Sequence, residues 1–129
     1  MIARQRRNWD DLAFLDPLWA ILSDPARRFG GWDVGEFFAT GEREISEILS
    51  RQRPQHTEAA LDFGCGVGRL TRALARRFDR CVGVDISPRM IELARTRNAD
   101  VERCVFMVNE ADSLEMFDSE EFDFVYSNI

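Results

Sequence analysis

Hydrophobic and polar positions follow different patterns in the two parts of the chain. In residues 1–57, apolar residues recur at helical spacing, which predicts a helix over about 41–53 and shorter helices before it. The turn Arg53-Pro54-Gln55-His56 ends this region, and short apolar runs alternate with helical stretches after it. The boundary between two structural units is therefore predicted at residues 57–58.

Four short apolar runs in residues 58–129 predict buried parallel strands, because both faces of such strands are covered. Between them, helices are predicted over about 68–78 and 88–97, the second with Ser87 as N-cap and Pro88 at its first position. Alternating strands and helices indicate an α/β fold, a doubly wound and mostly parallel sheet with an N-terminal helical extension. The strand runs are 59–63, 81–86, 104–109 and 122–127.

The charge is concentrated in one late segment. The 129 residues carry a net charge of −6, and the stretch 109–123 holds seven acidic residues and no basic one. No basic patch is evident, so nucleic acid is not an expected partner. All 17 basic residues are Arg, which leaves no side-chain amine for Schiff-base chemistry.

The start of the chain lacks the apolar core of a signal peptide, and no apolar run is long enough to span a membrane. The three cysteines form no C-x-x-C pair, and each lies in or beside an apolar run. A cytoplasmic protein without a membrane partner or a metal site is expected.

Three glycines mark the most informative segment, where the first predicted strand turns into a helix. Gly64, Gly66 and Gly68 provide positions without Cβ, which a tight turn or the close approach of a ligand requires. A tight βα turn alone is the simpler alternative. Asp85 favours a ligand site, because an acidic residue at the end of the second strand accepts hydrogen bonds from ribose in nucleotide-binding folds. A solvated Asp85 that caps the next helix is the alternative.

The glycine spacing distinguishes between nucleotides. The dinucleotide fingerprint G-x-G-x-x-G would need glycine at the position of Arg69, whereas the chain has G-x-G-x-G. S-adenosylmethionine has no pyrophosphate and does not need that register. The spacing therefore favours S-adenosylmethionine over NAD.

Residues 59–129 resemble the N-terminal half of the nucleotide-binding domain of class I S-adenosylmethionine-dependent methyltransferases. The resemblance rests on four motifs in order, which are LDFGCGVG at 61–68, VGVDIS at 82–87, NEAD at 109–112 and FDFVYSN at 122–128. It implies a Rossmann-like sheet with strand order 3-2-1-4. It also implies that S-adenosylmethionine is the cofactor.

The resemblance further implies a set of cofactor-binding residues from all four motifs. Gly64 and Gly66 are expected at the methionine moiety, and Asp62 either orders the loop or reaches the amino group through water. Asp85 is expected at the ribose. The full set is Asp62, Gly64, Cys65, Gly66, Gly68, Asp85, Ile86, Met90, Ala111, Asp112 and Ser127.

The remaining expectations concern the adenine and the end of the fourth strand. Ile86 and Met90 are expected to flank the adenine ring, and Asp112 to accept from its amino group beside the backbone of Ala111. The alternative for Asp112 is a solvated member of the acidic run. Ser127 is expected beside the methionine end, and Cys65 contributes only backbone.

The sequence identifies no catalytic residue. The family's Asn/Asp-Pro-Pro-aromatic motif of adenine and amide methylation is absent after the fourth strand, so a small-molecule methyl acceptor is expected. The aromatic-rich residues 1–57 suggest a cover that excludes water from the transfer, or ordinary packing against the sheet. The competing functions are an NAD(P)-binding oxidoreductase domain and a non-catalytic S-adenosylmethionine-binding module.

The length is shorter than the resemblance implies. Predicted strands begin about every 20 residues, so three further strands would need roughly 60 more residues. A truncated gene product or fragment that holds most of the cofactor site is therefore expected.

Overall fold

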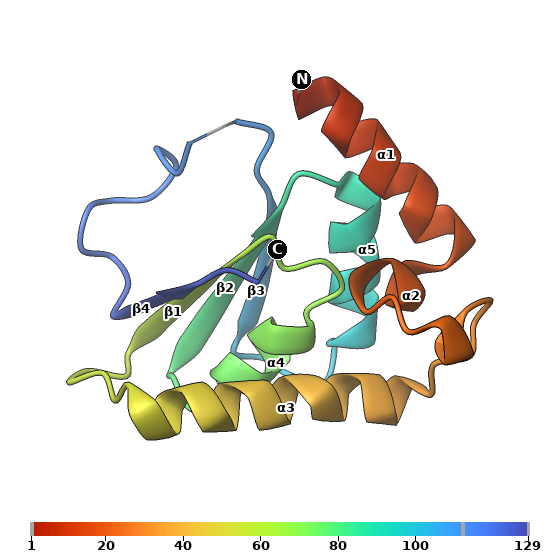
Figure 1. Cartoon of the computed structure of the whole chain (residues 1–129). Coiled ribbons are helices and arrows are strands. Elements are labelled where there is room, and N and C mark those ends of the chain that lie inside the picture. Colours follow the sequence, from red (N-terminus) through yellow and green to blue (C-terminus); the bar gives the residue numbers. More distant parts are fainter. Residues whose placement is uncertain (1, 112, 129) are drawn as a thin grey trace.

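The N-terminal third of the chain is helical in the computed structural model, which describes residues 2–111 and 113–128 (Figure 1). The four elements are α1 (Ile2–Leu15), α2 (Pro17–Ile21), the short 3-10 helix η1 (Pro25–Arg27) and α3 (Val34–Arg51). Helix α3 begins earlier than predicted because the Asp33 carboxylate caps it, accepting from the Glu36 amide at 2.9 Å. Helices α1 and α2 are among the shorter helices predicted before it.

The remaining chain forms a four-stranded parallel sheet with the order β3-β2-β1-β4. The predicted fold class and strand order are confirmed. Its strands are β1 (Ala59–Phe63), β2 (Arg80–Asp85), β3 (Cys104–Val108) and β4 (Phe124–Tyr126), with α4 (Arg69–Ala75) and α5 (Pro88–Arg97) between the first three. Helix α5 has the predicted bounds, because Ser87 caps it by accepting from the Met90 amide.

Strand β4 is shorter than the predicted run 122–127. The Asp123 carboxylate accepts from the backbone amides of Glu58 and Ala59 at 2.9 and 3.0 Å. The Asp123 amide still donates to the Ala59 carbonyl at 2.8 Å, while its carboxylate binds the amides at the start of β1, and the regular strand β4 begins at Phe124. At the other end, the Ser127 hydroxyl donates to the Phe63 carbonyl at 2.9 Å.

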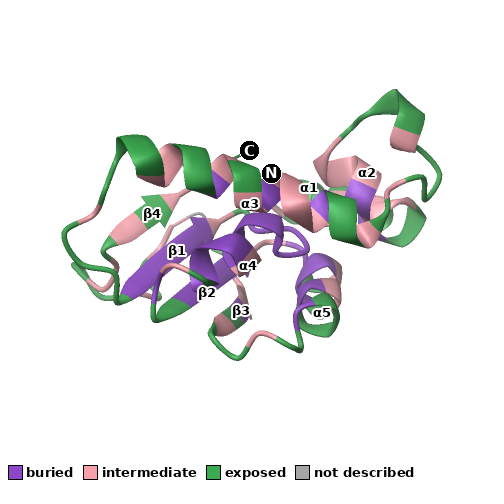
Figure 2. Ribbon diagram, turned by 90° about the horizontal axis from the view of Figure 1, so that it is seen from below, coloured by how far each residue is buried: buried purple, intermediate pink, exposed green. Residues whose placement is uncertain are grey.

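The two faces of the sheet are covered differently. One face packs against α3 and α4 through a core that contains Ile45, Leu74 and Phe78. The opposite face carries Leu61 and Val84 and is covered by apolar side chains of the 109–123 segment. In its described residues, that segment forms turns and bends. Figure 2 shows this burial, with β1, most of β2 and α4 coloured as buried.

The close approach of α3 to α4 depends on Gly41. A Cβ at this position would collide with the backbone carbonyl of Arg69, the first residue of α4. Helix α4 directly follows the glycine loop, so this contact sets the distance between the N-terminal helices and the loop.

We expect Gly41→Ala to destabilise the fold by about 2 kcal/mol or more, since both partners are backbone and cannot rotate away. Gly35→Ala is the matched control in the same helix, where the new Cβ would meet only the Asp33 side chain. That variant should be neutral or slightly stabilising, because alanine favours helix over glycine. Urea unfolding of both variants measures the difference, and equal stabilities would contradict this account of the α3–α4 contact.

Candidate functional site

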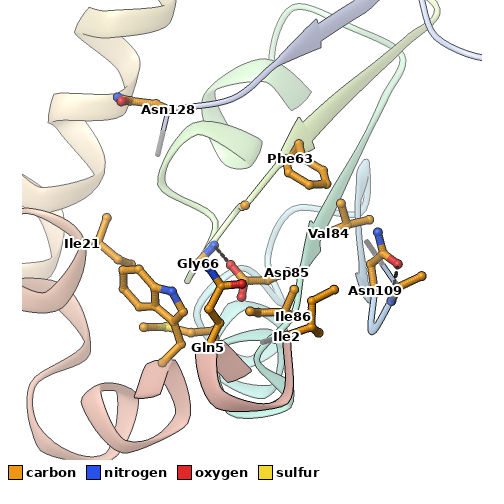
Figure 3. Close-up of a pocket in the computed structure, with 14 residues that line it drawn as sticks. Ile2, Gln5, Ile21, Phe63, Gly66, Val84, Asp85, Ile86, Asn109 and Asn128 are labelled. Carbon is orange, nitrogen blue, oxygen red and sulfur yellow. Dashed lines mark hydrogen bonds between the residues drawn. The ribbon is translucent and has the colours of Figure 1, made fainter. Parts of the chain in front are cut away.

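A cavity of about 730 Å³ lies at the carboxyl ends of the strands, under α1 (Figure 3). The cavity brings together the glycine loop, the ends of β1 to β3, Asn128, and side chains of α1 and α2. The lining residues are Ile2, Gln5, Trp9, Ile21, Phe63, Gly64, Gly66, Val84, Asp85, Ile86, Met90, Asn109, Ala111 and Asn128. Of the predicted cofactor-binding residues, six are in this set: Gly64, Gly66, Asp85, Ile86, Met90 and Ala111.

The glycine loop is held against the end of β2. The backbone amides of Gly64 and Cys65 donate to the Val84 carbonyl at 2.8 and 2.9 Å. Gly66 has a φ of 55°, and a Cβ there would lie 2.7 Å from the Ile21 side chain. Glycine is therefore required both by the left-handed backbone and by the close approach of α2.

Gly68 lies at the end of the glycine loop, beside α5 and β3 rather than in the cavity wall. It has a φ of 88°, and its absent Cβ leaves room for Asn98 and Phe106 rather than for the cavity. Gly68 therefore allows the start of α4 to pack against α5 and β3, and it is not among the lining residues.

Asp85 joins the loop to the second strand. Its Oδ2 accepts from the Gly66 amide and its Oδ1 from the Ser87 amide, both at 2.9 Å. Burial raises the pKa of this carboxyl, while the amide hydrogen bonds oppose that shift. The N-cap of α5 is Ser87, so the capping alternative for Asp85 is limited to the Ser87 amide, and the carboxylate still borders the cavity.

Asp62 lies beneath the loop rather than in the cavity. It is buried, and its Oδ2 accepts from the Thr71 hydroxyl of α4 at 2.7 Å. Desolvation raises its pKa to about 7, against the effects of Thr71 and Arg69. Of the two expected roles, its observed contacts correspond to ordering the loop.

Cys65 is buried in the loop, and its side chain packs near Gly83 of β2. Burial raises the pKa of its thiol well above the usual value. The side chain is not part of the cavity wall, and only the backbone of Cys65 takes part in the loop.

Asn109 directly follows β3, lines the cavity, and holds the turn after the strand through its side-chain amide. Its amide oxygen accepts from the Ala111 amide at 3.2 Å and its nitrogen donates to the Ser113 carbonyl at 3.0 Å. Asp112, expected at the adenine, lies outside the described residues. Asn109 stands in the NEAD motif but was not among the predicted site residues, and its place directly after a strand was the available signal.

The Ser127 hydroxyl donates to the carbonyl of Phe63, and Ser127 is not among the lining residues. The next residue, Asn128, borders the cavity instead. Arg69, the first residue of α4, is buried and pairs with Glu44 of α3 at 3.1 Å.

Helix α1 covers the cavity with Ile2, Gln5 and Trp9. Its Asp10 carboxylate accepts from the Ser87 hydroxyl, and also from the Arg89 amide at 3.2 Å, and so lies on the N-terminus of α5. Sequence reasoning suggested a cover without identifying these contacts, since nothing in a helical pattern indicates which loop or helix end it will meet.

A second tie holds α1 at the opposite rim. Arg6 pairs with Glu110 at 2.8 Å, in the segment that follows β3.

In the described ranges, no three metal-ligating side chains lie together, and no helix is long and apolar enough to cross a bilayer.

The fold and the site define a class. A parallel sheet of order 3-2-1-4 with a glycine loop and an acidic residue at the end of the second strand is the arrangement of class I S-adenosylmethionine-dependent methyltransferases. Residues 60–129 match the family model described as a methyltransferase domain, and because the match covers more than half of the chain, the chain belongs to this family.

Among curated proteins, the chain is similar to trans-aconitate 2-methyltransferases. It is 38% identical over 77 residues to that of Rhodococcus jostii, covering 56% of this chain and 30% of the relative. It is 35% identical over 95 residues to that of an Enterobacter species, covering 72% of this chain and 36% of the relative. The chain thus spans about a third of the length of these relatives.

Solved structures share the fold. A phosphoethanolamine N-methyltransferase of Haemonchus contortus, in complex with phosphoethanolamine and S-adenosylhomocysteine, superimposes with a TM-score of 0.69 at 21% identity, over 98% of this chain and 25% of its own. The N-methyltransferase NodS of Bradyrhizobium japonicum gives 0.62 at 21% identity, over 93% and 54%. These similarities concern the fold alone.

The raised pKa of Asp62 makes stability depend on pH. Its pKa is about 7 in the folded chain against an ordinary 3.8, so between these values the folded state binds more protons than the unfolded state. Stability contributed by the protonated carboxyl is complete below about pH 4 and is lost as the pH rises through 7.

We expect Asp62→Asn to lose less stability than the wild type between about pH 5 and about pH 8, because the amide cannot ionise. Urea unfolding at both pH values measures this. The same pH dependence in variant and wild type would place the pKa of Asp62 outside this interval.

Proposed function

We propose that the cavity binds S-adenosylmethionine and that the chain carries the methyl-donor site of a small-molecule methyltransferase. The observation that carries the proposal is the contact between Asp85 and the Gly66 amide, at the opening between β1 and β2. Ligands of open α/β sheets bind outside the carboxyl ends of the strands. The family to which the chain belongs and the dimensions of the cavity support the same assignment.

The residues present fit this cofactor. Asp85 supplies carboxylate oxygens for the ribose hydroxyls, and the glycine loop allows the backbone to approach the methionine moiety. Ile86 and Met90 provide an apolar surface for the adenine ring beside the polar groups of Asn109 and the Ala111 backbone. The same reasoning assigns Asp112 to the adenine amine and leaves Gly68, Asp62 and Cys65 as residues that shape the loop.

The chain contributes alignment and exclusion of water to the reaction. When bound, S-adenosylmethionine supplies an electrophilic methyl group on a sulfonium. The glycine loop and Asp85 orient that group, and Trp9, Ile2 and Ile21 keep an apolar surface over it. Holding two reactants in line accounts for several kcal/mol of a typical barrier, so a displacement of this kind does not require a general base.

We infer two functional parts from this arrangement. Residues 58–129 bind the cofactor, and residues 1–57 provide a cover whose α1 closes the cavity. A small-molecule acceptor is proposed because the similar curated proteins are named for trans-aconitate and because a cavity under a helix suits a compact substrate. Nucleic acid is not proposed as a partner.

Asp85→Ala should weaken binding of S-adenosylhomocysteine by roughly tenfold to a hundredfold, because it removes charged hydrogen-bond acceptors from the ribose site. Titration calorimetry of wild type and variant measures the loss. Asp79→Ala is the control, since Asp79 is exposed at the amino end of β2, away from the cavity.

Titration with NAD in the same series separates the two cofactor classes. Tighter binding of NAD than of S-adenosylhomocysteine, or an affinity for S-adenosylhomocysteine that Asp85→Ala leaves unchanged, would overturn the proposal.

Removing the carboxylate that holds α1 should speed the release of the cofactor. Asp10→Ala breaks the contacts with Ser87 and Arg89, and we expect stopped-flow dissociation of S-adenosylhomocysteine to become several-fold faster. Asp11→Ala is the adjacent exposed control. If both variants released the ligand at the wild-type rate, α1 would not be the cover.

A further inference from the structure

One carboxylate of the N-terminal helices contacts three different side chains at the edge of the cavity. Glu44 lies in α3, and its Oε1 accepts from Arg69 Nη2 at 3.1 Å. Its Oε2 accepts from the Tyr126 hydroxyl and from Asn128 Nδ2, each at 2.8 Å. A single side chain thus joins α3, α4 and the end of β4.

The partner on α4 is a buried cation. The Arg69 side chain is only 6% exposed, and it also donates to the Thr40 hydroxyl of α3 at 3.2 Å. Arg69 directly follows Gly68, so its position is set by the glycine loop. A buried guanidinium without a carboxylate partner is costly, and Glu44 is therefore the group that Arg69 requires.

The partners on the other oxygen lie at the end of β4. Tyr126 is the last residue of the strand, and Asn128 borders the cavity. Figure 3 shows the Asn128 side chain directed toward α3 and away from Asp85. The two sides of this junction are therefore the glycine loop, through Arg69, and the cavity wall after β4, through Asn128.

We propose that Glu44 is a positioning residue that fixes the wall at Asn128 relative to the glycine loop, at the part of the cavity that takes the methionine moiety of the cofactor. The inference rests on the proposed function, because it assigns that part of the cavity to the methionine moiety. The role does not involve contact with the reacting atoms. Glu44 acts through Arg69 and Asn128.

A second carboxylate of α3, Glu47, forms an exposed ion pair and provides a comparison for the buried contact of Glu44 with Arg69. Glu47 pairs with Arg51 within α3 at 2.9 Å, and their side chains are 64% and 76% exposed. Such pairs contribute little to stability or geometry. The environment of Tyr126 differs, since partial burial and then the Glu44 hydrogen bond raise its pKa to about 12.

The test compares two ligands that differ in the methionine moiety. S-adenosylhomocysteine keeps the amino-acid part of that moiety as homocysteine, whereas methylthioadenosine shares the adenosine and thioether but lacks the amino-acid part. We expect Glu44→Gln to weaken S-adenosylhomocysteine roughly tenfold by calorimetry and to leave methylthioadenosine within about twofold. Glu47→Gln, the matched control, should change neither affinity.

Glu44→Gln could unfold the chain, because it removes the charged partner of the buried Arg69. A second, milder variant avoids this loss. Asn128→Ala leaves the Glu44–Arg69 pair in place, and it should give the same selective loss of S-adenosylhomocysteine. Tyr126 is the single tyrosine, so isotope labelling at its Cζ gives one NMR resonance that reports on the Glu44 contact. That resonance should shift in Glu44→Gln and stay unchanged in Glu47→Gln.

The outcomes separate this inference from the proposed function. Equal weakening of both ligands, or an unchanged affinity for S-adenosylhomocysteine in Glu44→Gln and Asn128→Ala, would overturn the positioning role while wild-type binding still supported the methyl-donor site. A wild-type chain that bound neither ligand would overturn the proposed function itself, and the inference with it.

Discussion

The structure depends on the hydrogen bonds that close the glycine loop over the end of β2. Two loop amides bind the Val84 carbonyl, and a third, from Gly66, binds the next residue's carboxylate. These bonds fix a left-handed backbone that would be unfavourable for most residues. They satisfy polar groups that burial would otherwise leave without partners, and they place Asp85 at the cavity.

The N-terminal helices are built around this closed loop. Ile21 of α2 occupies the space that a side chain at Gly66 would need, and Gly41 of α3 lets the helix reach the backbone of Arg69. Asp10 of α1 contacts the N-cap of α5, which begins just after Asp85. Helices α2 and α3 thus contact the glycine loop or the residue after it, and α1 contacts the start of α5, so all three helices are held close to the cavity.

Local signals predicted the sheet, the glycine loop and α5, because apolar runs, glycines and an N-cap act over a few residues. The contacts between distant segments could not be predicted in this way. Asp123 binds the backbone amides of Glu58 and Ala59 at the start of β1, and Glu44 contacts residues more than 80 positions away. Asp62 lies beneath the loop beside Thr71 of α4, and Gly68 ends the loop beside Phe106 of β3 and Asn98, which follows α5, and the motif alone did not indicate these neighbours.

The contact of Asp10 with the start of α5 has a thermodynamic consequence. Ser87 both caps α5 and donates to Asp10, while its backbone amide donates to Asp85. The contact that holds α1 and the Asp85 carboxylate, which we propose binds the ribose, are therefore parts of one hydrogen-bonded turn. If a ligand at Asp85 favours the docked position of α1, then by linkage a docked α1 must favour the ligand by the same factor. In this arrangement, the docking equilibrium of α1 and the affinity for a ligand at Asp85 therefore report the same coupling free energy.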